Sequence, residues 1–499
     1  MNLKNTIFPQ VIQGGMGVGV SGWRLARAVS MTGQLGVVSG TALDVVLARE
    51  LQLGDPDGNL RHALDAFPFP EIAERVLKRF YIPEGKDAVA AFRNTPVHNA
   101  ESPHSLLELT IVAAFAQIFL AKEGHENPVG LNLLEKIQIP TLPSLFGAML
   151  AGVDYVLMGA GIPRQIPGIL DKFSEGQAAE LKLDVAGAAP DDPVVTKLNP
   201  ADFCGNPPPV LKRPRFLAIV SSAVLALNLK RKASGNIDGF VVEGATAGGH
   251  NAPPRGPMQL TDAGEPVYGP KDLPDLEKFR ELGLPFWLAG GYGRPGKLQE
   301  ALKQGAAGIQ VGTAFAFCRE SGLTPELKTS VLRQVREGKL RVFTDPCASP
   351  TGFPFKLVQL SGTLSDEKLS QERPRLCDLG FLRHLYRREN GSIGYRCPSE
   401  PIHDYIRKGG VADETRNRKC ICNGLLASIG LGQARGPGNV ELPVVTAGDD
   451  AALLSQFLPD GQESYSAAEV VNRLLADSAQ ADPRKTEPYI IHTAAPQSA

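Results

Sequence analysis

The sequence has almost no net charge, since 52 Lys and Arg residues face 53 Asp and Glu residues, a balance of -1 at pH 7. Such a balance gives no electrostatic attraction to nucleic acid or to an anionic membrane surface. The composition, 43% hydrophobic and 21% charged, is typical of a globular protein with a large core. We therefore expect a small-molecule substrate, and neither nucleic acid nor a membrane as partner.

The sequence also lacks a long apolar run and a secretory signal. Residues 1–10 show no basic start that leads into an apolar stretch and a small-residue cleavage site. The most apolar segment, residues 105–121, contains three polar side chains and is shorter than the roughly 20 residues that a membrane-spanning helix needs. We interpret it as a buried core helix, and we expect the protein to be cytoplasmic.

Cysteine is scarce: the chain has seven, an odd number without regular spacing, which argues against a disulfide framework. Thiolates can hold zinc or an iron–sulfur cluster, but the paired spacings that such sites use are missing. We therefore expect no metal, and ordinary buried thiols. Five cysteines fall in the last third of the chain: Cys347, Cys377, Cys397, Cys420 and Cys422.

What the sequence does contain is a repeated alternation of short apolar runs with stretches of helical period. This alternation is typical of a parallel sheet built from βα units. Eight units predict an α/β fold, the (β/α)8 TIM barrel. A doubly wound sheet gives the same alternation and is the alternative. The eight runs are Val11–Gly15, Leu35–Gly40, Pro128–Leu134, Tyr155–Gly161, Arg215–Ser222, Phe240–Gly244, Phe286–Gly291 and Gly308–Phe315.

Three segments interrupt the alternation: a helical insertion at about 42–124, a polar, Pro-rich loop at 174–214 and a Pro/Gly loop at 251–274. Ser21 is expected to cap the helix that follows the first run. Beyond Glu320 the alternation stops. We therefore divide the chain into a barrel at 1–338, a cysteine-containing C-terminal extension at 339–480 and a flexible tail at 481–499.

Glycines cluster after the seventh and eighth runs, where TIM barrels often bind phosphate-bearing ligands. Gly290 and Gly291 follow the seventh run, and Gly312 and Thr313 end the eighth. Glycine lets the backbone approach a ligand closely, backbone N–H groups can face a phosphate, and threonine adds a hydroxyl. Either pair alone is most often an ordinary turn. Together, at these two positions of one barrel, they favour a phosphate site.

A single imidazole, His250, stands at the end of the sixth run after Gly248 and Gly249. Histidine has an unperturbed pKa near 6.5 and suits general-base work, and the small residues around it leave room for a flat ring. A lone histidine is more often structural. Its place at the C-terminal end of a strand favours a catalytic role instead.

A third glycine-rich strand end, Gln13-Gly14-Gly15-Met16-Gly17, follows the first run. Its glycines let backbone amides approach the edge of a planar ligand, and Met16 offers a soft apolar contact to a ring. Together, the three strand ends predict a pocket for a phosphorylated aromatic cofactor.

In their order and spacing these motifs resemble the family that holds nitronate monooxygenases, formerly called 2-nitropropane dioxygenases, and flavin-dependent enoyl-ACP reductases. The resemblance covers roughly residues 5–320 and implies a TIM barrel that holds FMN non-covalently. His250 matches the family's active-site histidine. Carried over by position, the phosphate would be held by Gly290, Gly291, Gly312 and Thr313. The isoalloxazine would lie by Gln13, Gly14 and Met16, and Gly15, Gly248 and Gly249 complete the predicted cofactor site.

On this resemblance we expect an FMN-dependent oxidoreductase that oxidises alkyl nitronates with O2, with His250 as base. Two rivals stay open: an enoyl-thioester reductase that uses NAD(P)H, and a barrel that binds a phosphorylated ligand without turnover. The shared motifs bind flavin in both enzyme branches, so they do not separate them. The oligomeric state is also open, with a homo-oligomer among the alternatives.

Overall fold

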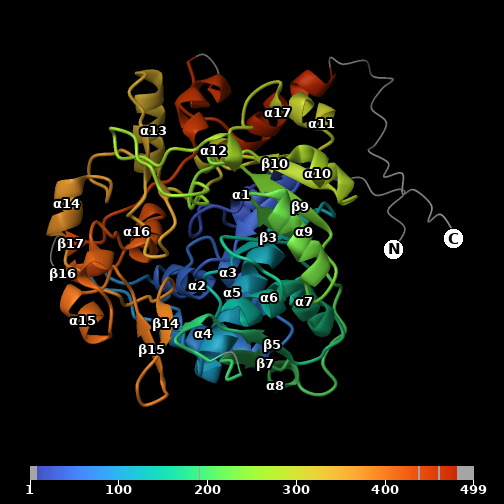
Figure 1. The fold of residues 1–499 in the computed structure, drawn as a ribbon. Helices are drawn as coiled ribbons and strands as arrows, with labels where there is room; N and C mark the ends of the chain where they lie inside the picture. The colour runs from blue at the N-terminus through green and yellow to red at the C-terminus, as the bar shows by residue number, and fades with distance from the viewer. Residues whose placement is uncertain (1–7, 190, 437–438, 459–460, 480–499) are drawn as a thin grey trace.

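The computed structural model describes residues 8–189, 191–436, 439–458 and 461–479, and the tail predicted at 481–499 lies outside the described residues. Eight parallel strands form one sheet at the centre of the molecule (Figure 1). Almost all of their residues are buried, as expected for strands that are covered on both faces. The strands are β1 Val11–Gln13, β2 Gly36–Ser39, β3 Val129–Leu134, β4 Tyr155–Gly159, β8 Arg215–Val220, β9 Gly239–Glu243, β10 Phe286–Ala289 and β11 Gly308–Val311.

The sheet closes on itself through its first strand. β1 pairs in parallel with β11, and on its other side Ile12 forms a parallel bridge with Leu35, just before β2. The N–H of Gln13 donates to the carbonyl of Leu35 over 2.9 Å, and the N–H of Leu35 donates to the carbonyl of Val11 over 3.1 Å. The strand order β1-β11-β10-β9-β8-β4-β3-β2 is therefore a ring. This confirms the predicted (β/α)8 barrel over the doubly wound alternative.

The inside of the ring is filled by side chains. Ile12, Val37, Leu157 and Trp287 belong to one buried cluster contributed by strands around the ring. The indole N–H of Trp287 donates to the carbonyl of Pro9 over 2.8 Å and ties the segment before β1 to the N-terminal end of the barrel. The barrel is therefore a packed core and not a pore, so a ligand site has to lie at an end of the strands.

An outer ring of helices covers the strands. Its eighth position is taken by the last described helix, α17, which packs against α1 and α11. Helix α1 begins after Gly22, which caps it without a side-chain hydrogen bond, so the predicted Ser21 cap is wrong. The helices of the ring are α1 Trp23–Ser30, α5 His104–Lys122, α6 Thr141–Leu150, α7 Ile166–Ser174, α9 Ala223–Lys232, α10 Leu276–Glu281, α11 Lys297–Lys303 and α17 Ala467–Ala479.

Helix α5 contains the apolar segment that we interpreted as a core helix. By length and composition it could cross a membrane, but 78% of its most apolar window is buried. It packs against α1, α2 and α6, with smaller contacts to α3 and α4. The inserted helices are α2 Leu43–Gln52, α3 Asn59–Asp65 and α4 Pro70–Phe80. Since its neighbours are helices of the same chain, α5 is the buried core helix that the sequence predicts.

The segment predicted as a loop at 174–214 contains short strands outside the barrel. Strands β5, Ala179–Lys182, and β7, Val195–Leu198, pair in antiparallel fashion. Strand β6, Val185–Ala186, instead runs parallel to β14 of the C-terminal part of the chain. A four-residue helix, α8 Ala201–Cys204, follows. The alternation of small polar and apolar residues in so short a stretch gives too weak a strand signal to be recognised among the prolines.

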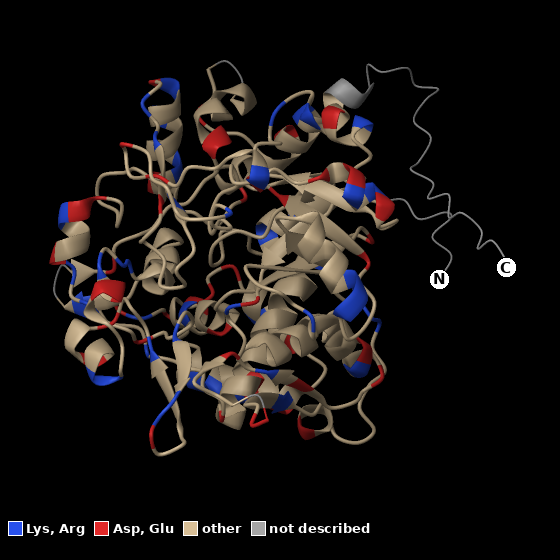
Figure 2. Cartoon of the chain, in the orientation of Figure 1, with Lys and Arg blue, Asp and Glu red and all other residues tan. Residues whose placement is uncertain are grey.

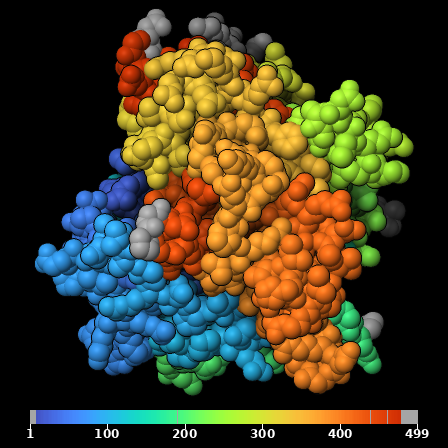
Figure 3. Space-filling view, turned by 90° about the vertical axis from the view of Figure 1, so that its left-hand side faces the viewer, coloured from blue at the N-terminus to red at the C-terminus, as the bar shows by residue number. Residues whose placement is uncertain are grey.

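The chain beyond the barrel strands forms a layer on one side of the molecule (Figures 1 and 3). We call residues 342–458 the C-terminal cover. Its buried residues, among them Phe355, Leu357 and Leu426, form a second apolar core with Val18 and Val45 of the barrel side. The elements of this part of the chain are α12 Thr313–Ala316, α13 Pro325–Arg336, β12 Val342–Asp345, β13 Phe355–Val358, α14 Glu367–Glu372, β14 His384–Arg387, β15 Ile393–Arg396, α15 Ile402–Arg407, α16 Ile421–Ser428, β16 Ala434–Gly436 and β17 Asn439–Val440, with 3-10 helices at Ala412–Thr415 and Asp449–Phe457. A further 3-10 helix, Pro270–Asp272, lies between β9 and α10.

Basic and acidic residues are interspersed along the chain, without a large region of one sign (Figure 2). The C-terminal cover also contains a buried ionic network. The carboxylate of Glu441, whose side chain is 3% exposed, accepts two hydrogen bonds from Arg373, at 2.7 and 2.8 Å. It also pairs with Arg435 at 2.7 Å, and Arg435 in turn pairs with Asp378 at 2.7 Å. One carboxylate thus neutralises two guanidinium groups inside the cover.

We predict that Glu441→Gln lowers the free energy of unfolding by about 3–5 kcal/mol, because it leaves the buried Arg373 without its counter-charge and Arg435 with Asp378 alone. Asp413→Asn is the control: it breaks the exposed pair between Asp413 and Arg416, whose side chains are 83% and 74% exposed, and should change stability little. Urea unfolding followed by circular dichroism measures both. Equal, small effects of the two changes would show that the Glu441 network does not stabilise the cover.

Candidate active site

A cavity of about 1610 Å³, counted with its open mouth, lies at the C-terminal ends of the barrel strands. We call it the first cavity. Its wall includes the loops after β1, β9, β10 and β11 and several residues of the C-terminal cover. Of the predicted site residues, those that line it are Gly14, Gly15, Met16, Gly248, Gly249, His250, Gly290, Gly291, Gly312 and Thr313. Residues that are 300 positions apart in the sequence therefore face one space.

Gln13 is the exception, because its side chain does not line the first cavity. It is fully buried, its Nε2 donates to Ser21 Oγ over 2.9 Å, and its Oε1 accepts from the N–H of Val37 over 3.0 Å. Side chains alternate between the two faces of a strand, and because Ile12 points into the barrel, Gln13 points to the outer side of β1, toward Ser21. Its amide supports the cavity wall from behind, and its place beside a cofactor stays a prediction.

The loops after β10 and β11 present unpaired backbone donors to the first cavity. Gly290 and Gly291 have φ angles of +88° and +72°, a conformation that favours glycine. A Cβ on Gly290 would also lie 3.0 Å from the carbonyl of Gly244. The N–H groups of Gly290, Gly291 and Gly312 find no backbone acceptor among the described residues. Free N–H groups at neighbouring strand ends can hold an anion.

A carboxyl group that the sequence did not indicate stands beside this anion site. Asp450, from the C-terminal cover, accepts a hydrogen bond from Thr313, and burial raises the pKa of its carboxyl. The Thr313 hydroxyl also accepts from the N–H of Gly448 over 2.9 Å. The hydroxyl that we predicted for a phosphate is thus already engaged in this structure.

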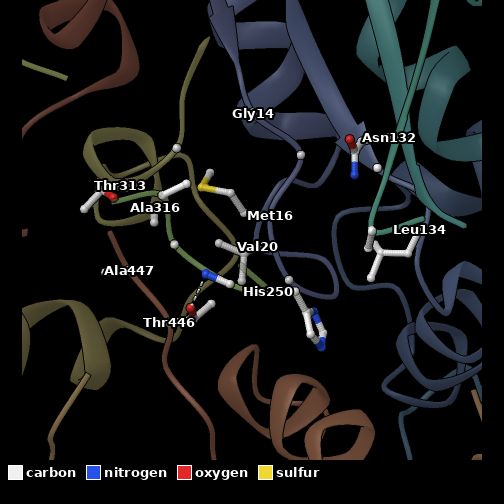
Figure 4. A pocket seen from close by; sticks show the side chains of 18 of the residues that line it. Gly14, Met16, Val20, Asn132, Leu134, His250, Thr313, Ala316, Thr446 and Ala447 are labelled. Atoms are coloured by element: carbon white, nitrogen blue, oxygen red, sulfur yellow. Dashed lines mark hydrogen bonds between the residues drawn. The ribbon is translucent and has the colours of Figure 1, made fainter. Parts of the chain in front are cut away.

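The loop after β1 is held by Ser21, which explains why this hydroxyl does not cap α1. Its Oγ accepts from the N–H of Met16 over 3.0 Å and donates to the carbonyl of Gly14 over 3.1 Å. A Cβ on Gly15 would lie 2.3 Å from the Cβ of Asn132, so only glycine fits there. Met16 reaches across the cavity wall toward the loop after β11 (Figure 4), and a Cβ on Gly312 would lie 3.4 Å from its sulfur.

Two amide side chains in the wall were not among the predicted site residues. The Oε1 of Gln310 is buried and has no hydrogen-bond partner among the described residues. Asn132 lines the same cavity, is 7% exposed, and its side chain makes no hydrogen bond within the described chain (Figure 4). Buried polar groups are normally paired, so an unpaired amide on a cavity wall indicates a polar ligand.

His250 is fixed from the side of the C-terminal cover. Its Nε2 lies 2.6 Å from the Oγ of Ser349, a fully buried residue whose Oγ is in turn 2.9 Å from the Oγ of Thr351. The ring of Phe355 packs edge-on against the imidazole, with centroids 4.8 Å apart. Burial lowers the pKa of His250 to about 4. The imidazole is therefore neutral at physiological pH and can accept a proton.

The cysteines of the C-terminal cover come closer together than their spacing suggested. Cys377, Cys397, Cys420 and Cys422 line one small cavity, and Cys422 also faces the first cavity. All seven cysteines of the chain are free thiols. In the part of the chain that the structure describes, no group of three or more His, Cys, Asp or Glu side chains is arranged to hold a metal ion.

Comparison with known proteins gives one match that bears on function. A family model for nitronate monooxygenase matches residues 208–344. A search of curated proteins finds no match. The matched segment runs from the approach to β8 to the beginning of β12, and it contains His250 and all four residues of the predicted phosphate site.

Among solved structures, similar folds are distant in sequence. FabK from Thermotoga maritima is 16% identical, with a TM-score of 0.46 over 94% of this chain and 93% of that one. A nitroalkane oxidase from Streptomyces ansochromogenes is 17% identical, with a TM-score of 0.45 over 96% and 98%. The enoyl reductase domain of MlnA from Bacillus amyloliquefaciens is 11% identical, with a TM-score of 0.47 over 94% of each chain. The nitronate monooxygenase model thus matches the segment that builds half of the barrel and most of the candidate site.

Proposed function

We propose that the chain is a cytoplasmic, FMN-dependent oxidoreductase that oxidises alkyl nitronates with O2. The observation that carries this proposal is the convergence of two features on one cavity. Unpaired N–H groups of Gly290, Gly291 and Gly312 can hold a phosphate, and the neutral imidazole of His250 faces the same space. A phosphate anchor beside a base suits a phosphorylated redox cofactor with the substrate next to it.

The donor set of the first cavity fits FMN. The phosphate would lie on the loops after β10 and β11, and the ring system would lie between Gly14, Gly15 and Met16. The unpaired Oε1 of Gln310 could accept from the N–H at the pyrimidine edge of the ring. One anion site without an adenine-binding βαβ fingerprint favours FMN over FAD. Bound FMN would supply the two-electron redox step.

His250 supplies the proton chemistry in this proposal. A neutral nitroalkane has to lose a proton from the carbon next to its nitro group, and the unprotonated imidazole can take it. Ser349 orients the ring through Nε2, so Nδ1 is the nitrogen that makes no hydrogen bond within the described chain. A preformed nitronate has already lost that proton and needs His250 only for binding.

The first test addresses the cofactor. The wild-type protein should purify yellow, and denaturation should release FMN. We predict that Gly312→Asp abolishes FMN retention, because it brings a carboxylate against the phosphate. Gly312→Asn is the matched control: it has the same shape without the charge, and its Cβ meets only the flexible Met16 side chain, so it should keep most of the FMN. Equal retention by the two variants would place the phosphate elsewhere, and a protein that stays colourless with added FMN contradicts the cofactor proposal.

The second test addresses His250. We predict that His250→Asn lowers turnover of a neutral nitroalkane by roughly 100-fold or more, the scale of lost general-base catalysis, and turnover of the preformed nitronate much less. Because the pKa of the imidazole lies at about 4, the wild-type rate with the nitroalkane should persist as the pH falls below 6.5 and decline only near pH 4. Oxygen consumption measures both substrates. Equal losses of turnover with the two substrates would show that His250 does not act as the base.

A second candidate function, reduction of an enoyl thioester by NAD(P)H, is favoured by the apolar residues that line the first cavity. Its outer wall is apolar and is supplied by both the barrel side and the C-terminal cover: Val18, Leu134, Ile137, Phe381, Leu382, Ile421 and Leu425. A small nitroalkane leaves much of this wall uncovered, whereas a long acyl chain would cover it.

Anaerobic reduction of the flavin separates the two candidates. If the chain is a nitronate monooxygenase, we predict that a nitronate bleaches the flavin band within the turnover time and that NADH and NADPH do so slowly. Rapid bleaching by a nicotinamide, with none by the nitronate and with reoxidation by an enoyl thioester, would establish the reductase instead. If the protein binds FMN but none of these reagents changes the flavin spectrum, the result would support the alternative of a barrel that binds a phosphorylated ligand without turnover.

A further inference from the structure

A second cavity, of about 940 Å³ with its open mouth, lies beside the first one. It is formed over the ends of β8 and β9 and is roofed by the loop that follows His250, with Pro253, Tyr268 and Phe353 in its wall. Four residues line both cavities: Ala160, Ile219, Glu243 and His250. The shared wall thus consists of two apolar side chains and two side chains that can carry a proton.

Glu243 is placed to act on a ligand and not on the protein. It is the last residue of β9 and pairs in register with Ala289, so its position is set by the barrel. Its carboxyl makes no hydrogen bond and no ion pair with any described residue. Carboxyl groups enclosed in a fold are normally paired, and this one borders open space on two sides.

No nearby charge holds Glu243 in its ionised form. The titratable groups that line the same cavities are His250, Tyr292, Cys422 and Asp450 around the first, and Arg255, Tyr268 and Asp272 around the second. Arg255 is exposed and donates to the carbonyl of Ser221 over 3.2 Å. Burial, without a charged partner, raises the pKa of Glu243 to about 7. Close to neutral pH much of this group is therefore the uncharged acid.

We propose that the second cavity binds the polar head of the substrate, and that Glu243 in its acid form donates a hydrogen bond to the substrate oxygen on which negative charge develops. The inference rests on the proposed oxidoreductase function but holds for both candidate substrates. Loss of a proton from a nitroalkane places the charge on the nitro oxygens. Addition of a hydride, which NAD(P)H would supply in the reductase alternative, to the β-carbon of an enoyl thioester places the negative charge on the carbonyl oxygen. A neutral acid stabilises either oxyanion, whereas a carboxylate would repel it.

This arrangement divides the proton chemistry between two residues. His250 takes the proton from the carbon of a nitroalkane and becomes the imidazolium, while Glu243 keeps its proton and shares it with the oxygen. The proton that leaves the carbon is thus on His250, and the proton of Glu243 stays on Glu243. Only the imidazolium has to release a proton to solvent afterwards. Glu243 is in this sense a second catalytic residue, because its acid group touches the reacting substrate.

Three variants of Glu243 test its role with a medium-chain 1-nitroalkane. The wild-type kcat should fall as the pH rises through about 7, because the acid ionises there. Glu243→Gln keeps a donor that cannot ionise, so it should lose this pH dependence and stay within about tenfold of the wild type. Glu243→Leu removes the donor and should lower kcat by about 100–1000-fold. A wild-type rate in Glu243→Leu, or the same pH profile in Glu243→Gln, would overturn the proposal.

Infrared difference spectroscopy tests the acid form without any turnover. The wild type should show a protonated carboxyl band that disappears as the pH rises through about 7, and Glu243→Gln should lack this band. Both results should hold for the FMN-free and for the FMN-loaded protein. A band that disappears near pH 4.5 would overturn the inference. Failure to bind FMN would instead contradict the proposed function and leave this titration interpretable.

A matched pair of bulky substitutions on α9 tests the second cavity. Leu225 lines it, and the neighbouring Val224 is 77% exposed and does not. Leu225→Trp should raise the Kd of the nitroalkane, measured through the visible spectrum of bound FMN, by at least about tenfold, with FMN retained. Val224→Trp should leave that Kd unchanged. An unchanged Kd in folded Leu225→Trp would move the substrate out of this cavity.

Discussion

Strand β1 is only three residues long, and the ring of strands closes through it. It pairs with β11 on one side and with Leu35 on the other, and the N–H of Gly14 donates to the carbonyl of Val311 over 2.9 Å just beyond the pairing. Because the strands are parallel, this closure brings the ends of the first and last strands together. Met16 and Gly312 touch as a result, and the glycine loops become one wall of one cavity.

The C-terminal cover then fixes the loops after β9 and β11. Ser349 holds the imidazole of His250 at 2.6 Å, Thr446 Oγ1 accepts from the N–H of Gly249 at 2.8 Å, and the N–H of Gly448 donates to Thr313 at 2.9 Å. These three contacts come from two separate parts of the cover, Ser349 and residues 446–448. A loop with several glycines has many conformations of its own, so contacts of this kind are what hold it ready for a ligand.

The barrel strands and the glycine loops could be predicted because their signals are local. A run such as Phe240 to Val242 is apolar on both faces, and a glycine at Gly290 is needed for a positive φ. The roles of Ser349 and Asp450 could not be predicted in this way. Each is a common residue type in an irregular segment, and only the packing of the cover against the barrel brings it to the site. The direction of Gln13, away from the barrel interior, depends likewise on where β1 begins, which the sequence pattern defines only to within a residue or two.

Burial also decides which protonation states the site can offer. In water, with ordinary pKa values of 6.5 and 4.5, a histidine and a glutamate between these two values of pH would be imidazolium and carboxylate. Neither form suits the proposed chemistry, since the base would already hold a proton and the acid would have lost one. Enclosure by apolar walls moves the pKa of His250 down to about 4 and that of Glu243 up to about 7. Between those two values both groups are neutral, so one fold provides a base and an acid side by side without their forming an ion pair.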